Sequence, residues 1–309
     1  MASEYVQETI GVSEAPAKDL VIKCDNLVKI YKTKDIEVLA LQGLDLEIER
    51  GELMAIIGNS GSGKSTFLNM IGGLDRPSAG RLIVDGKDLF KLTEKELVEY
   101  KRKTVGFVWQ NSARNLLPYL TAWENIQMPM LFDRTDLTKD HAFELLEMVG
   151  LAHRRNSKLS MLSGGEQQRI AIAIALANNP TILLADEPTG AVDVKTSAYI
   201  LDMFREINKN MGTTIVIVTH DRQLSKKVNR VASIRDGKIS SERIMKQSYK
   251  DRLSEIGAFT EESDVQDEYA ILDRAGRVQI PQEVLEKLGI EGNRVKLEEE
   301  DGRIVISKP

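Results

Sequence analysis

A glycine-rich stretch between an apolar run and a helical segment constrains this chain more than any other feature. Residues 58–66 read Gly-Asn-Ser-Gly-Ser-Gly-Lys-Ser-Thr, which fits the pattern G-x-x-x-x-G-K-S. The apolar run 53–57 before it is typical of a buried strand, and residues 67–71 after it are typical of a helix. Such a loop turns its backbone N–H groups toward a phosphate, and the helix start adds partial positive charge. The stretch therefore predicts a phosphate-binding loop, in preference to an ordinary glycine-rich turn.

The same pattern gives roles to individual side chains. Lys64 can reach the β- and γ-phosphates of a nucleotide, and the hydroxyl of Ser65 can ligate Mg²⁺. The residues that we expect to contact the nucleotide are Gly58, Asn59, Ser60, Gly61, Ser62, Gly63, Lys64, Ser65 and Thr66. Many kinds of nucleotide-binding protein use this loop, so the fate of the nucleotide depends on the rest of the chain.

Composition narrows the class of protein and its compartment. The net charge of −5 argues against a chain whose whole surface binds nucleic acid. The single cysteine, Cys24, cannot form an internal disulfide and fits a reducing compartment. No apolar run approaches the roughly 18 residues of a membrane span, and residues 1–18 lack the apolar centre of a signal peptide. We expect a soluble cytoplasmic protein that reaches a membrane only through a partner.

Changes in pattern divide the chain into four parts. Residues 1–18 show little periodicity and predict a mobile N-terminal arm. Residues 19–240 alternate strand and helix patterns, which indicates an α/β domain, with a mainly helical subdomain at about 111–162. Residues 241–264 are charged and predict a linker, and a separate small domain is expected at 265–309.

Two acidic residues follow a strand pattern that is apolar on both faces, residues 181–185. Such strands belong in covered parallel sheets, and ligands bind at the carboxyl ends of these strands. Asp186 can therefore hold Mg²⁺ beside Ser65, directly or through water. Glu187 can polarise a water for in-line attack on the γ-phosphate. A solvated acidic turn is the alternative, and the phosphate loop elsewhere in the chain disfavours it.

A second possible anion site lies at the start of another helix. Residues 162–169 read Leu-Ser-Gly-Gly-Glu-Gln-Gln-Arg, so Ser163, Gly164 and Gly165 can offer N–H groups and a hydroxyl to an anion. Taken alone, this string favours an ordinary N-capped helix. The phosphate loop in the same chain favours the anion site.

Taken together, these elements resemble the ATP-binding subunit of ABC transporters over about residues 20–240. The matching positions stand in the order of that family: Tyr31, Gly58–Thr66, Gln110, Leu162–Arg169, Ile182–Glu187, Asp193 and His220. The resemblance implies a P-loop ABC-type fold with a mixed sheet core, an antiparallel β subdomain and a helical subdomain. It also implies that two copies enclose two ATP molecules head to tail. Ser163, Gly164 and Gly165 of one copy would then contact the γ-phosphate held by Lys64 of the other.

The resemblance assigns roles to further residues. Tyr31 would stack on adenine, and Gln110 would reach both Mg²⁺ and the attacking water. His220 would bond the γ-phosphate and hold Glu187 in place. Asp193 would order the dimer interface.

The string at residues 115–125 narrows the resemblance to one branch of the family. With the Gly-Gly-Glu-Gln-Gln-Arg segment, it is similar to the lipoprotein-release, macrolide-export and antimicrobial-peptide-resistance ATPases, with the cell-division ATPase close by. In that branch, permease helices dock on the region after Gln110. Val192 departs from the usual Leu, a change that should preserve packing, and Trp109 replaces the commoner Phe.

The end of the chain carries a second resemblance. A strand pattern leads into Gly276-Arg277-Val278-Gln279-Ile280-Pro281, a short helix at 282–288, and strands at 294–298 and 303–307. This order is similar to the AbrB-like swapped-hairpin domain of transition-state regulators and antitoxins. The resemblance implies a dimer with interleaved strands, and a single copy of this size could hardly bury a core.

Members of that second family often bind DNA, but charge disfavours it here. From residue 267 onward the chain has ten acidic and seven basic residues, an unfavourable balance for phosphate contacts. Arg274 and Arg277 are the only candidates near the expected face. We therefore favour a dimerisation tether over a DNA reader, since a tether raises the effective concentration of the second ATPase domain.

The favoured function is an Mg²⁺-dependent ATPase that closes as a homodimer around ATP and drives a membrane permease. Such a protein would be cytoplasmic and peripheral on the inner face of the cell membrane. The alternative is a soluble ATP-dependent regulator whose C-terminal domain binds DNA. ABC ATPases of DNA repair or translation are disfavoured. Those proteins are split chains with long coiled coils or have tandem ATPase halves, and this sequence shows neither feature.

Overall fold

The computed structural model describes most of the chain from Lys18 onward. The described residues are 18–34, 36–111, 114–133, 139–221, 227–245, 266–273, 276–280, 282–290, 295–300 and 303–307. The N-terminal arm, apart from Lys18, and most of the expected linker lie outside these residues, as does Arg274. Within the part that is described, no helix has the length and hydropathy needed to cross a membrane.

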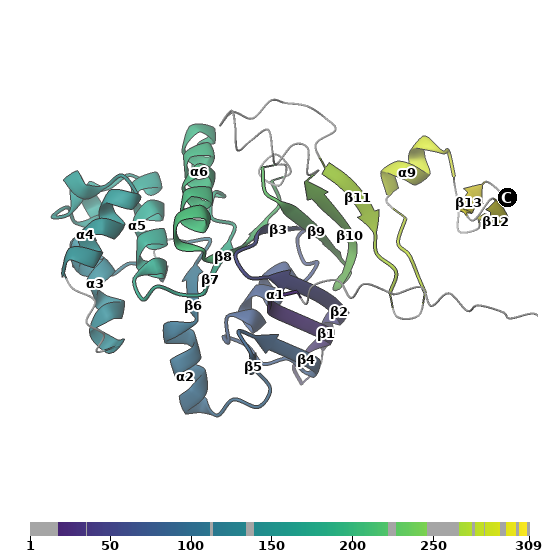
Figure 1. Ribbon diagram of the computed structural model, residues 1–309, viewed down its shortest axis with the longest axis horizontal. Coiled ribbons are helices and arrows are strands. Elements are labelled where there is room, and N and C mark those ends of the chain that lie inside the picture. The colour runs from purple at the N-terminus through teal and green to yellow at the C-terminus, as the bar shows by residue number, and fades with distance from the viewer. Residues whose placement is uncertain are drawn as a thin grey trace, which may run out of the picture.

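A seven-stranded sheet forms the centre of the molecule (Figure 1). Its strands run in the order β11-β10-β9-β3-β8-β7-β6, and the five from β9 to β6 are parallel. The bounds of those five are β3 (Leu53–Ile57), β6 (Val105–Val108), β7 (Ile182–Asp186), β8 (Thr214–Thr219) and β9 (Arg230–Arg235). All residues of β7 and β8 are buried, as their apolar runs predict. Parallel strands end at the same edge, so Ile57, Asp186 and Thr219 lie together there.

The sheet separates two hydrophobic clusters, because side chains alternate between its faces. Ala55, Ala185 and Ile217 face one cluster, which includes residues of the helices α3 to α6. Ile56 and Leu184 face the other, which includes residues of α1, α2 and the antiparallel sheet. The helix bounds are α1 (Lys64–Ile71), α2 (Glu94–Lys103), α3 (Ala122–Asp133), α4 (Lys139–Met148), α5 (Gly164–Leu176) and α6 (Val194–Met211), with short 3₁₀ helices at Ala152–Arg154 and Leu159–Met161.

The antiparallel sheet has the order β2-β1-β4-β5. Its strands are β1 (Leu20–Lys32), β2 (Glu37–Glu49), β4 (Ala79–Val84) and β5 (Lys87–Asp88). Strand β2 continues without a break across Gly43, whose φ of +84° is one that glycine adopts readily. Leu27 pairs with Leu44 and Val28 with Gln42, so Gly43 forms a β-bulge opposite β1.

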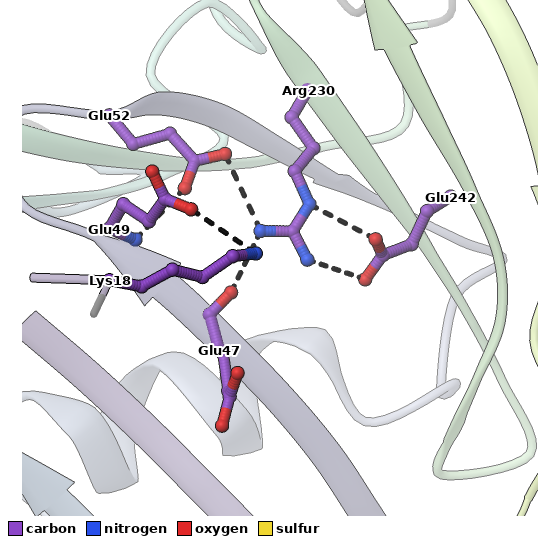
Figure 2. Close-up of polar contacts among 6 residues, drawn as sticks. All are labelled: Lys18, Glu47, Glu49, Glu52, Arg230 and Glu242. Atoms are coloured by element: carbon purple, nitrogen blue, oxygen red, sulfur yellow. Dashed lines mark hydrogen bonds and ion pairs between the residues drawn. The ribbon is translucent and has the colours of Figure 1, made fainter. Parts of the chain in front are cut away.

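Arg230, on β9, joins the two sheets through a half-buried ion cluster (Figure 2). Its Nη2 and Nε atoms donate to the carboxylate of Glu242 at 2.7 and 3.1 Å, and Nη1 donates to the carbonyl of Glu47 on β2 at 2.7 Å. Nη1 also lies 3.5 Å from Oε1 of Glu52. Burial raises the pKa of Glu52 against the opposing effect of Arg230. One guanidinium therefore donates hydrogen bonds to acceptors on both sheets, Glu47 on β2 and Glu242 on β10.

The C-terminal region differs from its prediction at the start and agrees at the end. Strand β10 (Lys238–Met245) continues past residue 240, so the expected domain end falls inside this strand. Strand β11 (Gln266–Ala270), at the start of the expected small domain, pairs with β10 and extends the central sheet. The rest matches the expected order, with α9 (Gln282–Lys287) followed by the hairpin β12 (Lys296–Glu300) and β13 (Arg303–Ser307).

Candidate functional site

The loop after β3 can adopt its path only with glycines at key positions. Gly61 and Gly63 have φ of +78° and +104°, a region that other residues rarely occupy. A Cβ atom at Gly63 would lie 2.6 Å from the carbonyl oxygen of Ala40, and one at Gly58 would lie 2.3 Å from that of Ile234. The predicted loop is thus held against two neighbouring segments, which fixes the direction of its backbone.

Lys64 begins α1 and folds back over the loop. Its buried side chain donates from Nζ to the carbonyl oxygens of Gly58 and Asn59, both at 2.9 Å. The hydroxyl of Ser62 is also buried and has no hydrogen-bond partner within the described structure. A cation and an unsatisfied hydroxyl in one glycine-rich loop fit a phosphate group.

Ser65 and Asp186 meet where α1 begins and β7 ends. The Ser65 Oγ donates to Asp186 Oδ1 at 3.1 Å. Burial raises the pKa of the Asp186 carboxyl, and the bond from Ser65 partly opposes this effect. A hydroxyl and a carboxylate side by side are oxygen ligands of the kind that Mg²⁺ prefers, so these residues fit the ion that the sequence predicts.

Glu187 and His220 form a close pair at the same edge of the sheet. His220 Nδ1 lies 2.7 Å from Glu187 Oε2. Glu187 adopts a φ of +45°, which is uncommon for a residue with a side chain, and its N–H donates to the carbonyl of Val218 at 2.8 Å. His220 thus contacts the carboxylate of Glu187 and the Val218 carbonyl holds its backbone, at the residue that directly follows Asp186, as a water-polarising group requires.

Gln110 reaches the same edge from β6. Val108 pairs with Ala185 in parallel register, so Gln110, two residues beyond, follows the strand end that neighbours Asp186. Asn115 shapes this turn, since it accepts the N–H of Trp109 at 3.2 Å and donates to the carbonyl of Phe107 at 2.8 Å. The Trp109 ring lies 4.2 Å from the Phe107 ring.

Tyr31 lies near the end of β1 and is partly exposed. Its hydroxyl donates to Asp75 Oδ2 at 2.6 Å, and Lys29 Nζ lies 4.6 Å from the ring centroid. Burial would raise the pKa of Asp75, but hydrogen bonds from Lys29 and Tyr31 bring it below its usual value. Asp75 and Lys29 were not predicted from the sequence. The spacing of Lys29 and Tyr31 along β1 places these two side chains on the same face of the antiparallel sheet.

The start of α5 is a capped helix end. The Ser163 Oγ accepts the N–H of Glu166 at 3.2 Å, and the Glu166 carboxylate accepts the N–H of Ser163 at 2.8 Å. This reciprocal pair is a capping box, as the interpretation of residues 162–169 as an N-capped helix predicts. A Cβ atom at Gly164 would have no neighbour within 4 Å, whereas one at Gly165 would lie 2.8 Å from Thr196 Cγ2. The cap therefore leaves the glycine at the tip accessible to an anion.

Asp193 caps the next helix, α6. Its Oδ1 accepts the N–H groups of Lys195 and Thr196 at 3.0 and 3.1 Å, and its Oδ2 accepts the Thr196 hydroxyl at 2.6 Å. These bonds, led by that hydroxyl, lower the pKa of Asp193. Val192 packs against the hydrophobic cluster, so the change from Leu preserves packing.

The structure brings five of the predicted site residues together and leaves the segment at the start of α5 in another part of the chain. Lys64, Ser65, Asp186, Glu187 and His220 meet at the carboxyl edge of the central sheet. The helix α5, which begins at the predicted second anion-binding segment, packs against α3, α4 and β6, whereas α1 packs against β2, β7 and β8. The two predicted anion-binding elements thus belong to different parts of one chain.

Comparisons with known proteins find matches to two regions of the chain. A family described as ABC transporter matches residues 41–190, and a family described as antidote-toxin recognition MazE, bacterial antitoxin, matches residues 270–309. The lipoprotein-releasing system ATP-binding protein LolD of Pseudoalteromonas translucida is 43% identical over 224 residues, which is 72% of this chain and 96% of that protein.

Two solved structures carry the same fold. One is the dimeric post-hydrolysis state of the ATP-binding cassette MJ0796 bound to ADP and Pi, with 41% identity and a TM-score of 0.66. The other is the dimeric structure of MJ0796, a bacterial ABC transporter cassette, with 42% identity and the same TM-score. Each comparison covers 72% of this chain and 97% of the solved one.

Proposed function

Since this chain belongs to the family of ABC transporter ATP-binding subunits, we propose that its phosphate loop, Asp186, Glu187 and His220 form the ATP-hydrolysing site of a cassette dimer. The observation that carries the proposal is the 2.7 Å contact between His220 and Glu187, beside the contact of Ser65 with Asp186. An acceptor for the proton of water thus stands next to the phosphate loop, as phosphoryl transfer to water requires.

Each residue then has a distinct task in hydrolysis. Lys64 exchanges its bonds to loop carbonyls for bonds to the β- and γ-phosphate oxygens of ATP. Ser65, Asp186 and Gln110 are the residues that would hold Mg²⁺, which neutralises charge on the phosphates when bound. Glu187 accepts a proton from the attacking water, and His220 fixes the orientation of that carboxylate.

The second anion-binding segment is assigned to the partner copy. The cassette MJ0796, which this chain resembles, is described as dimeric. We infer that Ser163, Gly164 and Gly165 of one copy close on the γ-phosphate held by Lys64 of the other, with Asp193 ordering the contact. Tyr31 stacks on the adenine ring. An incomplete site in one chain and an accessible capped helix in the same chain both support this arrangement.

The helical subdomain offers a surface for a membrane permease. Leu131 and Phe132, at the end of α3, are 72% and 67% exposed, and Tyr119 and Met161 are also exposed large side chains. Exposed apolar groups of this kind mark interaction sites. A permease of the lipoprotein-release and macrolide-export branch is the proposed occupant, which would place the subunit on the inner face of the cell membrane.

The small C-terminal domain is proposed to hold two copies together. Ile304 and Leu297 on its hairpin are 80% and 65% exposed, and Leu272 and Leu288 are exposed as well. A second copy of the hairpin would cover these apolar side chains, and the domain would then act as a tether. The regulator that binds DNA is not favoured, since acidic residues outnumber basic ones in this region.

Replacement of Glu187 by Gln tests the proposed site. This change preserves the size of the side chain but removes the proton acceptor, so phosphate release should fall about 10²–10⁴-fold while ATP still binds. Glu99→Gln, at an exposed position of α2, is the matched control and should hydrolyse ATP at the original rate. Hydrolysis by Glu187→Gln at the original rate would refute the assigned role.

A further inference from the structure

The C-terminal region is attached to the ATPase sheet by more than a covalent link. Strand β11 pairs with β10 over five residues, from Ser241 with Ala270 to Met245 with Gln266 (Figure 1). Beyond the strand, the N–H of Ile271 donates to the carbonyl of Ser240 at 3.2 Å. The Ile271 side chain packs against the hydrophobic cluster beneath the antiparallel sheet. The segment is thus anchored by both backbone bonds and apolar burial.

An ion pair joins this segment to the first residue of β10. Lys238 Nζ lies 3.2 Å from Asp273 Oδ2. Asp273 also accepts the N–H of Arg277 at 3.0 Å and the Arg277 guanidinium at 2.7 Å, so one carboxylate contacts both Lys238 and Arg277. Since residues 270–309 match the antitoxin family, Asp273 belongs to the C-terminal domain, whereas Lys238 belongs to the ATPase.

The turn before Lys238 contacts the phosphate loop directly. The N–H of Gly237 donates to the carbonyl of Ser62 at 3.1 Å, and the Gly237 carbonyl accepts the N–H of Gln42 at 2.9 Å. Gly237 has a φ of +71°, and a Cβ atom there would lie 2.7 Å from the carbonyl oxygen of Ala40. The turn is therefore fitted tightly between β2 and the phosphate loop.

We propose that docking of residues 266–273 on β10 holds the phosphate loop in its nucleotide-binding geometry through the turn at Gly237. Lys238 acts in this arrangement as a positioning residue, because it links Asp273 to the turn that bonds Ser62. The bond to the Ser62 carbonyl orients the peptide plane between Ser62 and Gly63, within the group of amides that faces the phosphates. A loop already held in this geometry binds its ligand more tightly, because less ordering is required on binding.

The inference rests on the proposed function, since it requires that residues 58–66 bind nucleotide. It adds a role for the C-terminal domain that a tether does not have. A tether affects only the encounter of two ATPase domains, whereas docking changes the affinity of each phosphate loop. By linkage, anything that pulls β11 away from β10 should weaken nucleotide binding, and bound nucleotide should favour the docked strand by the same factor.

Two variants of the full chain test the coupling. Lys238→Met removes the charge but keeps the length of the side chain, and Ile271→Asp places a charge in the apolar contact. Both should speed hydrogen exchange at residues 266–270, and we expect them to weaken binding of a fluorescent ATP analogue about twofold to tenfold. Lys238→Arg keeps the ion pair and should retain the original affinity. Lys23→Met, which breaks the exposed pair with Glu47, is the control that should also retain it.

The outcomes separate the coupling from the proposed function. If exchange at residues 266–270 rises but affinity stays unchanged, the coupling is wrong and docking serves only as an anchor. If the original chain binds no nucleotide, the proposed function fails and the coupling fails with it. A melting temperature measured for each variant identifies general unfolding, and Lys238→Met, a change at a partly exposed position, provides the test if Ile271→Asp does not fold.

Discussion

At the scale of single residues, the site shows which properties a sequence carries and which arise only from folding. Motif spacing selected Lys64, Asp186 and Glu187 as candidate site residues, because each follows or precedes a recognisable strand or helix. The positive φ of Glu187 was not predictable, since nothing in the local sequence demands it. Asp75 was missed for a related reason, because it reaches Tyr31 from 44 residues away along the chain.

Tyr31 provides a prediction at this scale. Tyr31→Ala should weaken ATP binding by about 1–3 kcal/mol, the usual loss when a base is deprived of an aromatic stacking partner. Tyr31→Phe keeps the ring and loses only the bond to Asp75, so it should bind ATP almost as well as the original chain. Titration with ATP measures both, and unchanged binding by Tyr31→Ala would exclude the stacking role.

At the scale of elements, local patterns predicted most helices and strands but not their partners. The capping boxes at Thr93 and Ser163 and the buried strands β7 and β8 were predictable, because each depends on residues close in sequence. The pairing of β11 with β10 was not, because alternation does not say which edge a strand will join. The same limit applies to the end of β10, which continues past residue 240 to Met245.

The ion cluster at Arg230 provides a prediction about how these elements hold together (Figure 2). Arg230→Met leaves the carboxylates of Glu242 and Glu52 without their shared cation, so unfolding should require about 3 kcal/mol less free energy. Arg235→Met removes an exposed arginine of the same strand, whose Nε lies 4.0 Å from the carboxylate of Asp236, and should have little effect. Urea unfolding of both variants measures the difference, and equal losses would mean that the cluster adds no stability.

At the scale of the whole molecule, two features of one chain support the proposed second copy. The phosphate loop and the start of α5 are both suited to anions but belong to different parts of the subunit. The hairpin β12–β13 exposes the apolar side chains of Leu297 and Ile304, which the proposed second copy would cover. The sequence therefore predicts a partner copy, whereas the attachment of the small domain to the ATPase sheet required the structure.

The tether can be tested without nucleotide. Ile304→Asp places a charge on the exposed apolar face of β13, so the chain should change from a dimer to a monomer in light scattering. Val98→Asp, at an exposed apolar position on α2, is the control and should remain dimeric. A dimer that persists in Ile304→Asp would argue against contact through this hairpin.

The central claim is that each ATP site is built from two chains, and a mixed dimer tests it most directly. Lys64→Ala disables the phosphate loop, and Ser163→Arg blocks the start of α5, so either homodimer should be nearly inactive. A purified heterodimer of the two variants contains one site with both changes and one site with neither. We predict that it hydrolyses ATP well above the rate of either homodimer, and a heterodimer no more active than the homodimers would contradict the shared site.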